Sequence, residues 1–261
     1  MPDITVDDGC IIHTELEGPE TAPVLMLSNS LGTTLHMWDA QVAPLTQHFR
    51  LLRYDRRGHG KSSVPKGPYS MERLGRDVVA VLDALKIAKI NWCGLSMGGM
   101  VGQWLGANAG NRVEKLVLSN TSCYFPDKNG WNDRLKLVAE KGVAAFAPAN
   151  MERWFTKGFR EREPQTVARI QAMFAATALE GYLSCGAAVR DMDHRALLPK
   201  ITTPTLVIAG RHDPATPLEG NEYIQQHIPG AKLAVVDAAH LANVEAPKAY
   251  TDAVLGFLLN K

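Results

Sequence analysis

Short apolar segments alternate with amphipathic segments of helical period along most of the chain. Six apolar runs predict buried strands, at residues 24–28, 51–54, 90–94, 113–119, 205–209 and 232–236. Longer stretches predict helices at residues 72–85, 97–107 and 246–259, with a further helix between the last two strands. Residues 4–6 and 11–15 predict an opening hairpin around Asp8-Gly9. This alternation is typical of an α/β fold whose mostly parallel central sheet carries helices on both faces.

Residues 123–198 break the alternation, because they contain no apolar run of the strand type. Helical patterns fill this stretch instead, at residues 132–141, 142–147, 151–156, 164–177 and 180–189. We interpret the stretch as a helical cap, or lid, inserted into a core formed by residues 1–122 and 199–261. An insertion between two core strands is expected to lie over the catalytic edge of the sheet. The alternative is an ordinary run of surface helices.

Composition and charge limit the partners of the protein. The 261 residues are 46% hydrophobic, which is enough for one large core, and the formal net charge of +1 gives no electrostatic basis for binding nucleic acid or a membrane surface. No apolar run predicts a membrane span, and the start of the chain lacks a signal-peptide pattern. The four widely spaced cysteines are typical of free thiols in a reducing compartment, so we expect a cytoplasmic protein. The pattern leaves the oligomeric state open.

Gly94-Leu95-Ser96-Met97-Gly98 matches the pattern G-x-S-x-G and lies between a predicted strand and a predicted helix. In that context the serine occupies a strained turn, and glycines two residues away avoid the collision that a Cβ would cause. The start of the helix adds free N–H groups and a positive dipole end. Ser96 is therefore the predicted nucleophile. The alternative is a glycine-rich helix start that serves packing alone.

The loops after the last two predicted strands supply a base and its partner, which a serine nucleophile requires. His240 follows the strand at residues 232–236, and Asp213 follows the strand at residues 205–209. The chain order Ser, Asp, His separates this arrangement from two other well-known serine triads. We interpret His59, in the loop after residues 51–54, as structural. Other side chains compete for the two roles: Asp191, Asp193, Asp237, His212 and His36.

Two backbone N–H groups are expected to hold the negative oxygen of a tetrahedral intermediate. Met97, the residue after the nucleophile, supplies one of them. Leu31 is expected to supply the other, from the loop Asn29-Ser30-Leu31-Gly32 after the strand at residues 24–28. Such loops often begin with His-Gly, and Asn29-Ser30 stand at those positions here. The alternative is that the loop is only a glycine turn.

These motifs, together with Asp55-Arg56-Arg57-Gly58-His59-Gly60, resemble those of the α/β-hydrolase superfamily over essentially the whole chain. Five segments are more narrowly similar to 3-oxoadipate enol-lactonases: the Asn29 loop through Trp38, the Gly94 motif with Gly99, Thr121-Ser122, Trp131-Asn132-Asp133-Arg134 and Ala188-Val189-Arg190-Asp191-Met192-Asp193. Those enzymes open an enol-lactone late in bacterial protocatechuate and catechol breakdown, in the β-ketoadipate pathway, and give 3-oxoadipate.

The resemblance implies a carboxylic ester hydrolase that acts through an acyl-enzyme on Ser96 and requires neither a metal nor another cofactor. The sequence contains no metal-binding spacing such as H-E-x-x-H. The implied small-molecule substrate is a lactone that carries a carboxylate, so a cation of the cap is expected to bind it. Arg134 is the first choice, one helical turn from Trp131, and the other candidates are Arg153, Lys157, Arg160 and Arg190. Trp131 and Trp154 are expected either to line the pocket or to pack the cap on the core.

Several alternatives remain open at this point. Another serine-triad relative would be a carboxylesterase, a cofactor-free haloperoxidase or perhydrolase, or a carbon–carbon bond hydrolase. Haloalkane dehalogenases and epoxide hydrolases are disfavoured, because they need aspartate where Ser96 stands. A ligand receptor on a hydrolase scaffold is the non-enzymatic alternative, although a receptor has no need of an intact triad.

Overall fold

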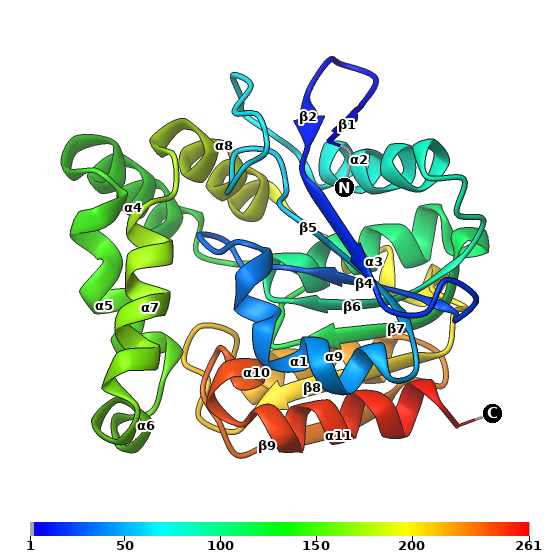
Figure 1. The fold of residues 1–261 in the computed structure, drawn as a ribbon. Helices are drawn as coiled ribbons and strands as arrows, with labels where there is room; N and C mark the ends of the chain where they lie inside the picture. The colour runs from blue at the N-terminus through cyan, green and yellow to red at the C-terminus, as the bar shows by residue number, and fades with distance from the viewer. Residues whose placement is uncertain (1–2, 261) are drawn as a thin grey trace.

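The computed structural model describes residues 3–260 and contains a seven-stranded sheet with the order β3-β5-β4-β6-β7-β8-β9 (Figure 1). Its strands are β3 (Thr14–Glu17), β4 (Val24–Ser28), β5 (Arg50–Tyr54), β6 (Ile90–Leu95), β7 (Val113–Ser119), β8 (Thr205–Gly210) and β9 (Lys232–Val236). β3 runs antiparallel to β5, and each of the other neighbouring pairs is parallel. The predicted mostly parallel sheet is therefore confirmed, with one antiparallel strand at an edge.

Burial along the strands explains why the apolar runs predicted them. Every residue of β6 and β8 is buried, as expected for strands that are covered on both faces. The edge strands are more polar, since β3 carries Glu15 and Glu17 and β9 begins with the exposed Lys232. The opening hairpin is present as β1 (Ile4–Thr5) and β2 (Ile11–Ile12), and the chain then continues into β3 of the main sheet.

Helices cover both faces of the sheet. The core contains α1 (Asp39–Thr46), α2 (Met71–Ala84), α3 (Met97–Asn108), α9 (Leu218–His227), α10 (Ala242–Glu245) and α11 (Pro247–Leu258), with the 3₁₀ turns η1 (Leu35–Trp38), η2 (Gly110–Arg112) and η4 (Leu198–Lys200). Figure 1 shows α2 and α3 packed together on one face of the sheet and α1 and α11 packed together on the other. Because parallel strands end at the same edge, the loops after β4, β6, β8 and β9 meet there.

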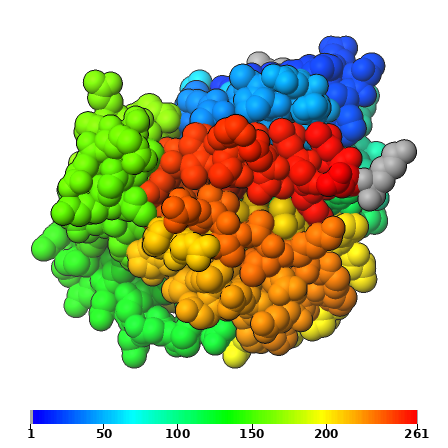
Figure 2. Space-filling view, turned by 90° about the horizontal axis from the view of Figure 1, so that it is seen from below, coloured from blue at the N-terminus to red at the C-terminus, as the bar shows by residue number. Residues whose placement is uncertain are grey.

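Helices also fill the insertion between β7 and β8. They are α4 (Lys128–Lys141), η3 (Val143–Phe146), α5 (Ala147–Trp154), α6 (Lys157–Arg162), α7 (Pro164–Ala175) and α8 (Leu179–Asp191). We use the name cap for residues 123–198, and these boundaries stay a prediction. The chain leaves and re-enters the core at neighbouring positions, since Tyr124 and Asp193 form an antiparallel bridge and the His194 N–H donates to the Cys123 carbonyl at 2.7 Å. In Figure 2 the cap, coloured green, forms a lobe at one side of the molecule.

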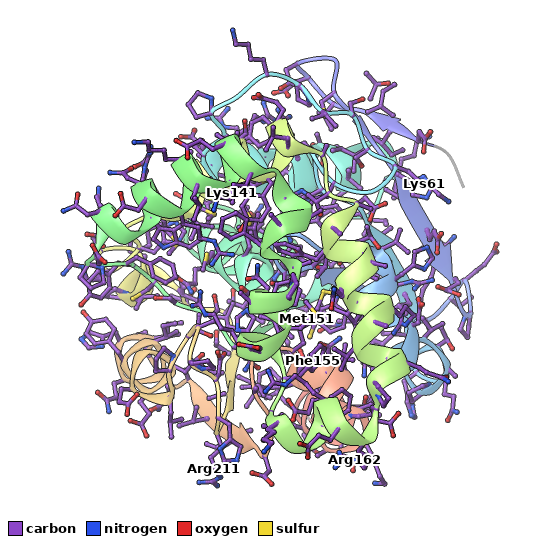
Figure 3. The ribbon with its side chains drawn as sticks, turned by 90° about the vertical axis from the view of Figure 1, so that its left-hand side faces the viewer. Lys61, Lys141, Met151, Phe155, Arg162 and Arg211 are labelled. Carbon is purple, nitrogen blue, oxygen red and sulfur yellow. The ribbon has the colours of Figure 1, made fainter. Side chains whose placement is uncertain are left out.

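Aromatic side chains hold the cap together. Phe155 at the end of α5 is buried and stacks on Phe159 of α6, with ring centroids 5.1 Å apart. Phe174 of α7 is also buried and makes edge contacts with Trp154 and Tyr182, at 5.3 and 5.6 Å. Figure 3 looks onto this part of the cap.

No single helix within residues 3–260 is long and apolar enough to cross a membrane. Only the bent pair α7 and α8, taken together, passes that test by length and composition.

One backbone contact fixes α8 of the cap against the core. A Cβ built on Gly181 would lie 1.9 Å from the Gly58 carbonyl oxygen, and a Cβ on Gly58 would lie 2.6 Å from the Gly181 Cα. Backbone stands on both sides of this contact, so neither side can yield as a flexible side chain would. This contact therefore requires glycine at both positions, because neither residue can carry a side chain.

We predict that Gly181→Ala lowers the free energy of unfolding by about 1–3 kcal/mol, because overpacking forces the backbone apart. Gly158→Ala in α6 is the matched control, since a Cβ there meets nothing within 4 Å. We expect that variant to stay within about 1 kcal/mol of the wild type. Urea unfolding followed by circular dichroism measures both, and equal stability of the two variants would contradict the predicted contact.

Candidate active site

Ser96 lies at the turn between β6 and α3 in a backbone conformation that serine rarely adopts, with φ 57° and ψ −115°. The neighbouring glycines permit this turn, because a Cβ on Gly94 would lie 2.1 Å from the Gly98 carbonyl oxygen and one on Gly98 would lie 2.1 Å from the Ser28 carbonyl oxygen. The Thr121 hydroxyl supports the turn by donating to the Ser96 carbonyl at 2.7 Å. The turn directs the Ser96 side chain into a cavity.

His240 and Asp213 form a buried pair beside Ser96. The Nδ1 atom of His240 lies 2.8 Å from Asp213 Oδ2, and the two side chains are 4% and 0% exposed. Burial alone would raise the pKa of Asp213, but the His240 ring and hydrogen bonds from Thr216 outweigh it, so the pKa of this carboxyl lies below its ordinary value. A charged Asp213 accepts the Nδ1 proton and leaves Nε2 of His240 available as a base.

Further donors complete the surroundings of Asp213. The backbone N–H groups of Ala215 and Thr216 donate to Oδ1 at 2.8 and 3.0 Å, and the Asn120 amide donates to Oδ2 at 3.1 Å. A carboxylate with this many donors stays charged without a cationic partner. Asn120 and Thr216 were not predicted as partners of Asp213, because each contact depends on how separate loops meet.

The competing acidic residues have other partners. Asp237 is exposed and bonds to Nε2 of His212 at 2.9 Å, away from the buried pair. Asp191 forms an ion pair with the adjacent Arg190, and Asp193 forms one with Arg195, two residues further along the chain. His36 is half exposed and lies 3.3 Å from Asp39. None of these side chains lines the cavity that contains Ser96 and His240.

Leu31 and Met97, the residues of the two predicted N–H donors, line the same cavity. Within residues 3–260 neither N–H group has an acceptor, whereas the adjacent Gly32 N–H donates to Nε2 of His59 at 2.9 Å. Two free N–H groups beside a serine nucleophile can hold a developing oxyanion. Burial and the nearby charge of Arg56 lower the pKa of His59 to about 3, which keeps its ring neutral and able to accept.

Asn29 fixes the loop that carries Leu31. Its side chain accepts from the Trp38 indole N–H at 2.9 Å and donates to the Tyr54 carbonyl at 2.9 Å. Its own carbonyl accepts from the Gly98 N–H at 3.0 Å, which joins this loop to the start of α3. The residue that stands in place of the usual histidine therefore has a structural role that its position alone did not reveal.

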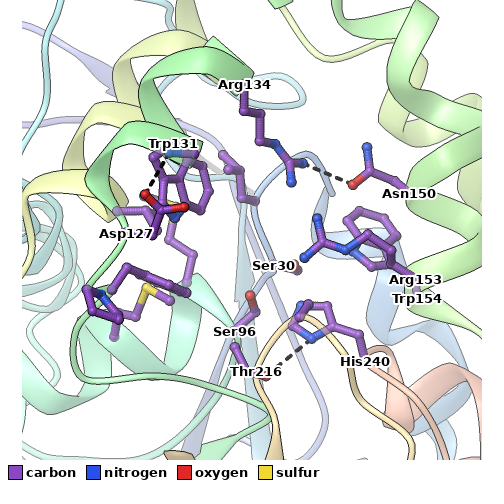
Figure 4. A pocket seen from close by; sticks show the side chains of 18 residues that line it. Ser30, Ser96, Asp127, Trp131, Arg134, Asn150, Arg153, Trp154, Thr216 and His240 are labelled. Carbon is purple, nitrogen blue, oxygen red and sulfur yellow. Dashed lines mark hydrogen bonds between the residues drawn. The ribbon is translucent and has the colours of Figure 1, made fainter.

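The cavity has a volume of about 300 Å³ and lies between the core loops and the cap (Figure 4). The core contributes Ser96, His240, Leu31 and Met97 to its lining. From the cap, four side chains face them across the cavity: Trp131, Arg134, Arg153 and Trp154. Within residues 3–260 no group of three or more His, Cys, Asp or Glu side chains is arranged to hold a metal ion.

Two cap arginines line the cavity together with one cap carboxylate, Asp127, which accepts from the Gly130 N–H at 3.0 Å. Arg134 donates to the Tyr182 hydroxyl at 2.9 Å and to the Asn150 side chain at 3.0 Å, and its guanidinium lies 5.3 Å from the centre of the Trp131 ring. Desolvation and the charge of Arg134 lower the pKa of Arg153. Neither arginine forms an ion pair with a carboxylate in the described part of the chain. A bound anion would supply the missing partner.

Arg190, another candidate from the sequence, does not line this cavity. Its guanidinium donates to both oxygens of Asp191, at 2.9 and 2.7 Å, and to the Asn132 side chain at 3.1 Å. The structure thus brings together Ser96, Asp213, His240, Leu31, Met97, Trp131, Arg134 and Trp154, and leaves Arg190 outside.

Comparison with known proteins agrees with this fold. The chain matches the family model of the alpha/beta hydrolase fold over residues 23–247, and it belongs to the α/β-hydrolase family. It is 41% identical to 3-oxoadipate enol-lactonase 2 of Acinetobacter baylyi, over 91% of this chain and 89% of that protein.

Two solved structures extend the comparison. The enol-lactonase from Burkholderia xenovorans LB400 is 43% identical with a TM-score of 0.97, covering 99% of this chain and 100% of that one. A hydrolase from Pseudomonas aeruginosa PA01 is 47% identical with a TM-score of 0.96, covering 98% and 97%.

The neutral state of His59 predicts a dependence of stability on pH. Between its ordinary pKa of 6.5 and its folded pKa of about 3, the unfolded chain binds a proton that the folded chain does not, so stability falls as the pH falls. The buried His194, whose pKa is lowered to about 4, acts in the same direction. His59→Gln keeps an acceptor but removes the titration, so we expect the slope between pH 4 and 6 to decrease by up to about 1.4 kcal/mol per pH unit. Urea unfolding at several pH values measures the slope, and an unchanged slope would contradict the assignment.

Proposed function

We propose that this protein hydrolyses the lactone ring of 3-oxoadipate enol-lactone to give 3-oxoadipate, as a carboxylic ester hydrolase. The observation that carries the proposal is the cavity in which a nucleophile turn and a His–Asp pair face two arginines without carboxylate partners. The relatives named as enol-lactonases support the choice of substrate. On the pattern of the sequence we also propose a cytoplasmic location.

The first half of the proposed reaction forms an acyl-enzyme. Ser96 Oγ attacks the lactone carbonyl while Nε2 of His240 takes its proton, and Asp213 stabilises the imidazolium. The carbonyl oxygen becomes an oxyanion, which the N–H groups of Leu31 and Met97 hold. When the tetrahedral intermediate collapses, the ring C–O bond breaks. The proton that His240 took from Ser96 passes to the departing enolate, which becomes a ketone, so the ring is open and His240 is neutral again.

The second half releases the product. A water molecule gives its proton to His240 and attacks the acyl carbonyl, and a second oxyanion forms in the same place. Ser96 then leaves with the proton that His240 returns. Beside the substrate these steps consume one water molecule.

The arginines account for the carboxylate that the lactone carries outside its ring. An ion pair in water contributes little, but a partly desolvated arginine can fix the orientation of a carboxylate through paired hydrogen bonds. The rings of Trp131 and Trp154 supply apolar walls beside the two cations. This arrangement orients the reacting carbonyl toward Ser96.

The direct test is to compare kcat/KM for 3-oxoadipate enol-lactone and p-nitrophenyl acetate with the wild type and Ser96→Ala. We expect the lactone to be the far better substrate and Ser96→Ala to lose about 10⁴-fold or more, because the nucleophile is gone. Preference for the aryl ester by a wide margin would indicate a general carboxylesterase. Binding of the lactone without turnover would indicate a receptor.

Arg134→Gln and Arg153→Gln test the binding of the carboxylate. We expect each to raise KM for the lactone by about tenfold or more, since loss of a charged hydrogen bond costs about 1.5–3 kcal/mol. Hydrolysis of p-nitrophenyl acetate, which has no carboxylate, should change little. Arg190→Gln removes the same charge outside the cavity and serves as the control. If all three variants gave equal values of KM, this role of the two arginines would be wrong.

A further inference from the structure

Glu245 is the last residue of α10 and lies five positions after His240 in the sequence. Its two carboxylate oxygens accept hydrogen bonds from two separate segments. Oε2 accepts from the Ala239 N–H at 2.9 Å, directly before the base, and Oε1 accepts from the N–H of Thr156 at 3.2 Å and from its hydroxyl. Thr156 lies in the cap, between α5 and α6. One carboxylate therefore joins the loop that carries His240, which we call the base loop, to the cap.

A second contact joins the same two segments on the other side of the base. The Leu241 N–H donates to the Trp154 carbonyl at 3.2 Å, so the residues before and after His240 are both tied to the end of α5 or to the residues that follow it. The Trp154 ring centre lies 6.2 Å from the His240 ring centre. Figure 4 shows Arg153 and Trp154 facing the cavity beside His240, and Figure 2 shows the orange-red α10–α11 segment against the green cap.

We propose that Glu245 is a positioning residue. It holds the catalytic base, His240, and the substrate-binding end of α5 in a fixed position relative to each other. α10 places the Glu245 carboxylate, because this helix starts directly after the base loop and the Glu245 N–H returns to the Leu241 carbonyl at 3.0 Å. Through Ala239 the carboxylate fixes the backbone that carries His240. Through Thr156 it fixes the last turn of α5, which carries Arg153 and Trp154. The part that concerns substrate binding rests on the proposed function, and the part that concerns the base does not.

A glutamine cannot replace this glutamate without loss. Three donors converge on two carboxylate oxygens, and an amide has one oxygen and an NH₂ group that would face a donor. Glu245→Gln therefore breaks the contact to the base loop or the contact to the cap. Thr156→Val is narrower, because it keeps the shape and the N–H of Thr156 and removes only the hydroxyl. Thr156→Ser keeps the hydroxyl and is its conservative partner.

The experiment measures kcat and KM for p-nitrophenyl acetate and for 3-oxoadipate enol-lactone, well below the unfolding temperature of every variant. We expect Glu245→Gln to lower kcat for both substrates by about 10- to 100-fold, since small displacements of a catalytic group are that costly. Thr156→Val should raise KM for the lactone about tenfold, leave turnover of the acetate near the wild-type value, and be rescued by Thr156→Ser. The kcat and KM of the double variant should be no worse than those of Glu245→Gln alone, because the Thr156 hydroxyl reaches the base loop only through Glu245. Thr156→Val also removes the N-cap bond from the Phe159 N–H to this hydroxyl, a loss that is read from the unfolding temperature.

Glu140→Gln, an exposed site on α4, is the control for the loss of one negative charge. If Glu245→Gln lowered the unfolding temperature but left kcat and KM unchanged, Glu245 would be merely structural and the proposal would be overturned. Additive effects in the double variant would also overturn it. If the wild type hydrolysed the acetate but not the lactone, the proposed function would fail, and kcat for the acetate would still decide whether Glu245 positions the base.

Discussion

The backbone of Ser96 is the constraint on which the whole site depends. A serine held at φ 57° and ψ −115° is strained by about 1–3 kcal/mol, and surrounding contacts have to maintain it. Gly94 and Gly98 leave room for the turn, and the Gly98 N–H meets the carbonyl of Asn29 from the neighbouring strand end. The same contact that stabilises the turn at Ser96 therefore also positions the loop that carries Leu31, the second oxyanion donor under the proposed function.

The charges of the site are separated along the cavity. The core side holds a buried negative charge on Asp213, saturated by five hydrogen-bond contacts and shielded from the cavity by the imidazole of His240. The cap side holds two arginines with no anionic partner in the described chain. Under the proposed function, the cap arginines attract the carboxylate at the remote end of the substrate, and its ester group, which is neutral, is left for Ser96. The two sets of charges still interact, because desolvation lowers the pKa of Arg153 and the charge of Asp213 acts to raise it.

Much of this arrangement followed from the sequence, for identifiable reasons. Strands covered on both faces must be apolar throughout, so β6 and β8 were visible as runs. The G-x-S-x-G turn and the order of the triad depend on local sterics and on strand order. In contrast, α1 contains Pro44 and has little amphipathic pattern, and it was not predicted. The choice between Arg153 and Arg190 also escaped prediction, because it depends on which face of a cap helix meets the core. Glu245 escaped prediction because its contacts join two segments that are distant in sequence.

The bridge between Tyr124 and Asp193 has a consequence for how such proteins diversify. A segment whose two ends are neighbours can be lengthened, shortened or exchanged for another without altering the order of the strands beneath it. Natural variation can then change the cap over the cavity while the residues at the strand ends of the core are inherited unchanged. The contacts of Glu245 with both the core and the cap limit this freedom, since an exchanged cap must still offer hydrogen-bond donors at the position of Thr156.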